Sequence, residues 1–426
     1  MILKNSAILA FFSILSLLLA VVRDRLLATY VGIGPVLDVY NASFRIPDLM
    51  YGAVLAFVTS GTVVPYLTQE DKHGKVYDPR TKLASLTLFF IAAMGVLALL
   101  FAVLLPLFAH KLVPGFSDEQ VSTFITTTRL LLLQPILLGI TSLISCLAQM
   151  KNQFLLYGLS PLGYSVGIII GIILFYPLYG VLGLIAGVLL GSALSLSIQA
   201  FSLRGVKLAS AFRKESFVYV WELARVALPR TGTNLVTQMR ILFFHGFATT
   251  LGPGVLSAYL FAQKITDSAV QVIQQSVTTA SIPVLSKDVV EQNIVAYSSL
   301  VRRYVAVLGV LGVAVASFLY VFHDFVITIL YGNTGSNDLI AFFLLGFLIS
   351  LPFQMMASYY AVGLYSARDT KDVFATYLLA SFLSVGTVLL SQGLGAQALV
   401  VGYVVFWVSN FLIILSFYSR KSRMLG

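Results

Sequence analysis

The sequence predicts an all-α polytopic membrane protein of about twelve transmembrane helices, arranged as two parallel six-helix repeats. The first observation behind this is composition: of the 426 residues, 58% are hydrophobic and only 10% are charged, and the mean hydropathy is +0.93. Such values are typical of a chain that crosses a bilayer many times. The second observation is a series of apolar segments of membrane-spanning length, and the third is an internal duplication.

The apolar segments are each long enough to cross a hydrocarbon core of roughly 30 Å, which takes about 20 helical residues. Turn and charge signals separate them, such as TQEDKHGKVYDPRTK, HKLVPGFSDEQ and SARDTKD. The first segment has no small-x-small cleavage site, so we expect a retained helix and not a signal peptide. The segments lie near residues 7–31, 36–66, 83–110, 122–149, 155–176, 179–203, 219–250, 255–285, 298–322, 339–366, 373–392 and 395–419.

Lys and Arg residues in the loops predict the orientation. When the loops are sorted alternately, one side collects nearly all of the loop Lys and Arg residues, whereas the other side has Lys111. Basic loops stay in the cytoplasm, so this bias predicts that both termini are cytoplasmic and that the number of spans is even. The net charge of +10 then reflects topology, and no nucleic-acid partner is expected.

Few residues suit metal, disulfide or enzyme chemistry. Cys146 is the single cysteine, which excludes an intrachain disulfide, and the four histidines lack ligand spacing. We therefore expect no metal and no cofactor. A membrane enzyme such as a polyprenyl glycosyltransferase would need acidic residues on the outer loops, and no Asp-x-Asp pair occurs there. The acidic residues of those loops are Asp118, Glu119, Asp324 and Asp338.

An internal duplication divides the chain. VLDVYNASFRIPD (36–48) aligns with VLSAYLFAQKITD (255–267) at an offset of 219, and PILLGITSLISCLAQMKN (135–152) aligns with PFQMMASYYAVGLYSARD (352–369) at an offset of 217. We predict two six-helix lobes, residues 1–214 and 215–426; because six is even, the repeats are parallel. The alignment pairs Tyr40 with Tyr259, Arg45 with Lys264, Asp48 with Asp267 and Pro135 with Pro352.

The second helix of each repeat carries a polar stripe at helical spacing. The stripes are Asp38, Asn41, Arg45 and Asp48 in the first repeat, and Lys264, Asp267, Gln271, Gln274 and Thr278 in the second. Lipid cannot solvate such stripes. One interpretation is a buried helix–helix contact joined by polar groups. The interpretation that we favour is a hydrated central cavity walled by both stripes.

Charges in the first and seventh helices add to this pattern. Arg23, Asp24 and Arg25 lie inside the first span, and Asp24 points about 100° away from each neighbouring arginine, so it cannot neutralise both. Arg240 lies in the seventh. Guanidinium groups bind phosphate oxygens bidentately, so a cationic cavity predicts an anionic substrate. For any one residue, an internal ion pair is an equal alternative. The candidate substrate-binding residues are Arg23, Asp24, Arg25, Asp38, Arg45, Asp48, Arg240, Lys264 and Asp267.

Several stretches then resemble a known family. SLLLAVVRDRLLATYVGIGPVLDVYNASFRIPDLMYGAVLAFVTSGTVVPYL, AYLFAQKITDSAVQVIQQSVTTASIPVLSK and GLYSARDTK occur in order over most of the chain. They resemble the MurJ (MviN) lipid II flippases of the multidrug/oligosaccharidyl-lipid/polysaccharide (MOP) exporter superfamily. The resemblance implies a MOP/MATE-like inverted-V fold of two lobes. It also implies that an undecaprenyl-diphosphate-linked peptidoglycan precursor, lipid II, moves from the inner to the outer leaflet of the bacterial inner membrane.

The resemblance also implies partners and roles. The expected partners are a lipid-linked diphosphate sugar and membrane lipids. We expect this protein to be a monomer, with cell-wall synthesis proteins as candidate partners. Arg23 and Asp24 match the family's helix 1 Arg-Asp pair, and Asp38 and Lys264 match cavity residues, with Asp267 on a neighbouring acid. The sequence departs from the family at Leu17 and at Tyr51-Gly52, where arginines are usual. The alternative is a MOP-type exporter of another lipid-linked oligosaccharide or of a drug.

Overall fold

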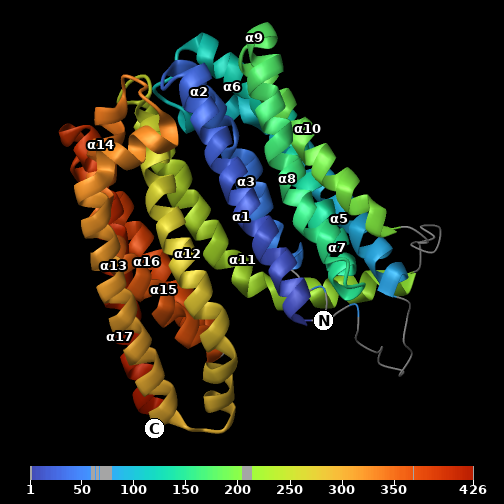
Figure 1. Ribbon diagram of the computed structural model, residues 1–426, viewed down its shortest axis with the longest axis vertical. Coiled ribbons are helices and arrows are strands. Elements are labelled where there is room, and N and C mark those ends of the chain that lie inside the picture. Colours follow the sequence, from blue (N-terminus) through green and yellow to red (C-terminus); the bar gives the residue numbers. More distant parts are fainter. Residues whose placement is uncertain are drawn as a thin grey trace. The chain divides into compact units, whose positions relative to one another are not determined.

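The computed structural model describes residues 2–58, 63, 67, 79–203, 214–367 and 369–425, and in that part of the chain every regular element is a helix. The helices form two compact units, Met1–Leu235 and Val236–Gly426, and the division falls inside α11. The predicted lobe boundary after residue 214 remains a prediction. Within each unit, long helices run alongside one another (Figure 1).

The first unit contains nine helices and most of a tenth among its described residues. They are α1 (Ile2–Leu26), α2 (Pro35–Ser43), α3 (Arg45–Val58), α5 (Pro79–Leu112), α6 (Asp118–Leu131), α7 (Leu133–Met150), α8 (Phe154–Ile170), α9 (Tyr176–Tyr179), α10 (Val181–Ala200) and the start of α11 (Lys214–Thr249). Short π-helical turns, Leu27–Val31 and Gly171–Phe175, extend α1 and α8, and a 3₁₀ turn, Phe201–Leu203, ends α10.

The second unit holds the end of α11 and six further helices among its described residues. These are α12 (Val255–Val290), α13 (Ile294–Tyr331), α14 (Asn337–Leu348), α15 (Leu351–Ser366), α16 (Thr370–Leu390) and α17 (Ala396–Leu425). The described residues of each predicted apolar segment therefore fall mainly on helix. By length and apolarity alone, seven described helices qualify as membrane spans, or eight if the bent pair α14–α15 is one span. The predicted total of twelve crossings remains a prediction.

The second predicted segment, 36–66, is not one continuous helix. It breaks at Phe44 into α2 and α3, and residues 59–62 and 64–66 lie outside the described part. Pro47 has no N–H to donate to the carbonyl of Ser43, and its ring disfavours a helix running through that point. Thr266 occupies the matching position of the second repeat, and α12 runs unbroken through it. A single substitution thus accounts for the different shapes of the two repeat helices.

The prolines that the duplication pairs have the same effect in both units. The α6–α7 junction at Leu132 lies three residues before Pro135, and the α14–α15 junction lies just before Pro352. In the second unit the two helices meet at a bend of 51°. Each proline removes one backbone donor, so the helix tightens or bends in the preceding turn. The duplication is therefore visible in the backbone as well as in the sequence.

Glycines allow α8 and α10 to pack with their backbones in contact. A Cβ atom at Gly167 would lie 2.2 Å from the Cα of Gly191, and one at Gly171 would lie 2.5 Å from the Cα of Gly187. Small residues at such crossings let membrane helices approach closely, and packing then replaces the hydrophobic effect as the source of stability. This contact holds α8 against α10, and the two helices run side by side in the first unit (Figure 1).

Candidate functional site

In the first unit, Arg23 and Asp24 form an ion pair although they are adjacent in α1. Asp24 Oδ1 accepts a hydrogen bond from Nε of Arg23 at 3.0 Å and lies 3.0 Å from its Nη2, and both side chains are mostly buried. In the sequence Asp24 stands between two arginines, and in the structure its partner is Arg23. The pair lies in the last turn of α1. There Arg23 also interacts electrostatically with the side chains of Tyr40 and Tyr164. Arg25, by contrast, is exposed.

The first polar stripe is divided between α2 and α3 by the break at Phe44. Asp38 and Asn41 are buried in α2. Arg45 and Asp48 lie in the first turn of α3, with Nη1 and Oδ2 3.7 Å apart, and the Asp48 side chain is 43% exposed. The stripe predicted for one helix face thus has a buried end and a more open, charged end.

Gln134 and Tyr164, which are not among the predicted site residues, lie near Arg23 and Asp48. Gln134 of α7 donates from Nε2 to the hydroxyl of Tyr164 in α8 at 2.8 Å. Tyr164 in turn interacts with both Arg23 and Asp48. An amide in an apolar helix, one residue before the paired Pro135, was the available signal in the sequence.

In the second unit, Arg240 is buried against aromatic rings. Its Cζ lies 3.8 Å from the ring centroid of Phe406 and 5.5 Å from that of Phe244, and the residue is 5% exposed. Among the described residues, it makes no ion pair within 4.0 Å and its Nε has no hydrogen-bond partner. A ring face attracts a cation, and this attraction offsets part of the cost of burying the guanidinium.

The second polar stripe follows the middle of α12 and is not buried. Lys264 is half-buried, with Nζ 5.3 Å from the Phe261 ring centroid, whereas Asp267 and Gln271 are exposed. Asp267 Oδ1 accepts a hydrogen bond from Gln354 Nε2 at 3.3 Å. Gln274 and Thr278, further along the same face, are half-buried. A charged and amide-rich face that is exposed in part and half-buried elsewhere therefore extends over about four turns of one long helix.

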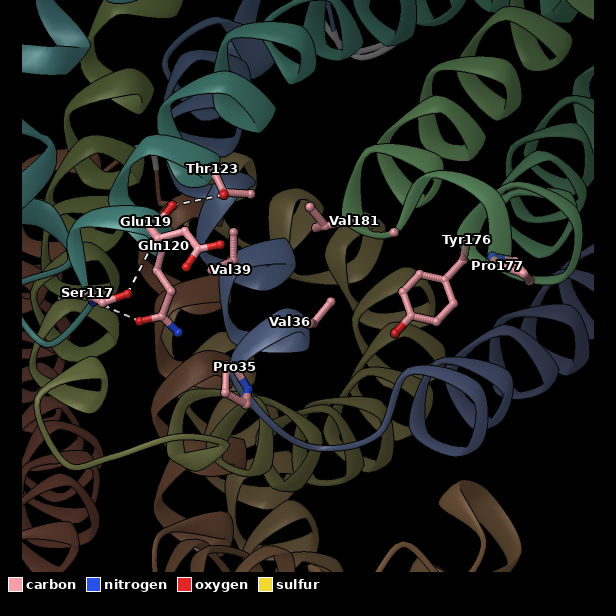
Figure 2. Close-up of a pocket in the computed structure, with 11 residues that line it drawn as sticks. Pro35, Val36, Val39, Ser117, Glu119, Gln120, Thr123, Tyr176, Pro177 and Val181 are labelled. Atoms are coloured by element: carbon pink, nitrogen blue, oxygen red, sulfur yellow. Dashed lines mark hydrogen bonds between the residues drawn. The ribbon is translucent and has the colours of Figure 1, made fainter.

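A separate cavity of about 790 Å³ lies where α2 begins, between α6 and the α9–α10 turn. Figure 2 shows Glu119, Gln120 and Thr123 of α6 on one side of it and Tyr176 of α9 on the other. Ser117 and Gln120 form a capping box that fixes the first turn of α6. Among the described residues that line this cavity, Glu119 alone is charged, so the cavity does not suit a phosphate group.

The fold matches solved transporters. A structure titled "Lipid II flippase MurJ, inward closed conformation" superposes with a TM-score of 0.80 at 18% identity, over 97% of this chain and 87% of the other. An inward-facing multidrug resistance MATE family transporter of the MOP superfamily gives a TM-score of 0.77 at 16% identity, over 96% and 95%. This likeness shows that the chain has the all-helical fold of the MOP transporters.

The sequence comparisons narrow this class to one family. The model of the family "Lipid II flippase MurJ" matches residues 27–425, so the chain belongs to the lipid II flippase MurJ family. A probable lipid II flippase MurJ of Rhizobium meliloti is 23% identical over 91% of this chain and 76% of its own length. The lipid II flippase MurJ of Burkholderia cenocepacia is 24% identical over 84% and 72%. The predicted family and fold class are thus confirmed.

Proposed function

We propose that this protein moves an undecaprenyl-diphosphate-linked peptidoglycan precursor, lipid II, from the inner to the outer leaflet of the bacterial inner membrane. A cationic central cavity opens alternately to each side and carries the headgroup. The proposed orientation places both termini in the cytoplasm, as the basic loops predict. Family membership supports a transport function and a multi-pass membrane location, and the residues below support an anionic headgroup.

The open polar face of α12 is the observation that carries the proposal. α12 has 36 residues and is therefore about 54 Å long, which is enough to cross a bilayer, and we propose that it does so with its middle at the depth of the hydrocarbon core. Lys264, Asp267 and Gln271 lie toward that part of the helix; Lys264 is half-buried, and Asp267 and Gln271 are exposed. Hydrocarbon cannot solvate a lysine or a carboxylate, so this face requires water or a polar ligand.

Cations outnumber acids among the candidate residues, which favours a diphosphate as that ligand. Asp24 pairs with Arg23 and Asp48 lies beside Arg45, whereas Arg240 packs against aromatic rings and interacts with Asp267 only electrostatically, without an ion pair in the described part of the chain. With Arg25 and Lys264, and with Asp38 and Asp267, the nine candidate residues comprise five cations and four acids, a net charge of +1. A diphosphate brings the negative charge that offsets this excess, and guanidinium groups bind it with paired hydrogen bonds.

The alternative is a MOP-type exporter of another lipid-linked oligosaccharide or of a drug, which the structural likeness to MATE transporters favours. Measuring lipid binding to the purified protein in nanodiscs distinguishes these functions. We expect undecaprenyl diphosphate to bind more tightly than undecaprenyl monophosphate, and we expect Lys264→Ala to remove this preference. Arg129→Ala is the matched control, because Arg129 Nε donates to a backbone carbonyl within the first unit. Equal binding of both lipids, or preferential binding of a cationic drug, would exclude the proposed substrate.

A further inference from the structure

A second cavity, of about 390 Å³, lies inside the first unit among α1, α3, α7, α8 and α10. It lies close to the ion pair of α1, because Tyr164 both lines the cavity and interacts with Arg23. None of the described residues that line it is charged. The volume lies within the range of small-molecule sites, about 300–1,000 Å³, and is much larger than a single ion or water needs.

The hydroxyl groups of this cavity present oxygen lone pairs. The hydroxyls of Thr141 and Ser142 donate hydrogen bonds to the carbonyls of Leu137 and Leu138, at 2.8 and 2.9 Å. Ser142 Oγ therefore accepts a hydrogen bond from the hydroxyl of Tyr51, at 3.3 Å. With its proton committed to the backbone, the Thr141 oxygen is left as an acceptor only.

The cavity also contains donors. The Tyr164 oxygen accepts a hydrogen bond from Gln134, so its proton is directed elsewhere. Gln199 is fully buried, and within the described part of the chain neither its Nε2 nor its Oε1 has a hydrogen-bond partner. A buried amide without partners costs about 1–3 kcal/mol per group, so an occupant that both donates and accepts is favoured.

This combination identifies the chemistry of the occupant. A metal cation would use only the acceptors, and an anion only the donors, but a sugar ring has hydroxyls that do both. Tyr51 and Tyr157 add aromatic surface beside the polar groups. The cavity extends from the buried Gln199 to the exposed Pro161, so it reaches the surface of the unit.

We propose that this cavity, lined by Tyr51, Thr141, Tyr164 and Gln199, is a subsite for one uncharged sugar ring of the lipid-linked substrate. The inference rests on the proposed function, because the sugar is delivered next to a diphosphate at Arg23. On this account the cations recognise the diphosphate, and the neutral cavity distinguishes a glycosylated lipid from a bare one.

The test compares two lipids on the full-length protein in nanodiscs: undecaprenyl diphosphate, and undecaprenyl diphosphate carrying one N-acetylglucosamine. Wild-type protein should bind the glycosylated lipid about tenfold more tightly, the equivalent of one or two well-placed hydrogen bonds. Gln199→Met should remove this preference and leave binding of the bare lipid unchanged, which also shows that the variant is folded. Thr141→Val is a second variant with the same expected result.

Ser197→Ala is the matched control, because Ser197 lies on the exposed side of α10 and bonds only to the Ala193 carbonyl in the described structure. It should retain the full preference. If wild-type protein binds both lipids equally, or if Gln199→Met keeps the preference, the cavity holds water only and the sugar subsite is wrong while the flippase proposal stands. If neither lipid binds, both proposals fall together.

Discussion

Arg129 Nε donates a hydrogen bond to the carbonyl of Ala102, at 2.9 Å, across the contact between α6 and α5. Ala102 lies four residues before Pro106, which is inside α5 and has no N–H to donate to that carbonyl. Arg129 thus supplies the donor that the proline removes. Its role is structural, in contrast to the substrate-binding role that we propose for Arg23 and Lys264.

Removing the hydrogen bond between Arg129 and Ala102 should lower the stability of the protein and leave transport unchanged. We expect Arg129→Ala to reduce the free energy of unfolding by about 1–2 kcal/mol, since a carbonyl at membrane depth loses its donor. Pro106→Ala restores the helical donor, so the same arginine substitution in that background should have a much smaller effect. Thermal unfolding of the four proteins in one detergent measures the cycle. Equal losses in both backgrounds would mean that Arg129 acts through another contact.

The close contact of α8 and α10 should not tolerate a side chain. A Cβ at Gly187 would lie 2.4 Å from the Cα of Gly171, so Gly187→Ala must push the backbones apart. We expect a loss of about 1–3 kcal/mol, as for overpacked cores, seen as a lower melting temperature. Gly95→Ala in α5 is the control, because nothing described lies within 4 Å of its Cβ position. A melting temperature for Gly187→Ala equal to that of the control would contradict this packing.

The ion pair of Asp369 and Lys421, outside the spanning helices, should make the stability of the protein depend on pH. Burial raises the pKa of its carboxyl, but the hydrogen bond from Lys421, at 2.9 Å, and backbone donors of α16 outweigh burial and lower the pKa overall. A folded-state pKa below the unfolded value, about 3.9, means that this stabilisation is complete above roughly pH 4 and is lost as the pH falls through the folded pKa.

Asp369→Asn removes the ion pair but keeps a side chain that can cap α16, where Asp369 accepts from the Asp372 N–H. We expect it to lower the melting temperature at pH 7, by the equivalent of about 1 kcal/mol, and to have a smaller effect at pH 3. Lys421→Met should give the same loss, and the double variant no more than either single one. A loss that is as large at pH 3 as at pH 7 would refute the assignment.

The proposed substrate charges should separate transport from folding. Arg23→Ala and Lys264→Ala should each abolish flipping while membrane insertion and expression stay normal, because we assign both residues to the diphosphate. Flipping of a fluorescent undecaprenyl diphosphate in proteoliposomes is the measurement, with Arg129→Ala as a variant that retains activity. Full activity in both alanine variants would show that neither residue binds substrate.

The sequence was sufficient for features that depend on local pattern. Apolar length located the helices, and the duplication paired Pro135 with Pro352, each of which lies just after a helix junction in its own unit. The break at Phe44 was missed, although Pro47 and its partner Thr266 were visible in the alignment, because the apolar run continues through both.

Contacts between distant segments were not predictable. The partner of Arg129 is a backbone carbonyl, which has no sequence signature, and the ring over Arg240 comes from Phe406, one aromatic residue among many. The neutral cavity around Gln199 is assembled from five helices by ordinary serines, threonines and tyrosines. Such residues indicate a site only when packing brings them together and leaves one of them without a partner.

Rescue of a bacterial strain depleted of its own lipid II flippase tests the central claim most directly. We expect expression of this protein to restore growth and normal cell shape, and Arg129→Ala to do the same, whereas Lys264→Ala, present in the membrane at an equal level, should fail. Failure of the wild-type protein to rescue growth, when it is inserted at the level of a rescuing family member, would contradict its assignment as a lipid II flippase.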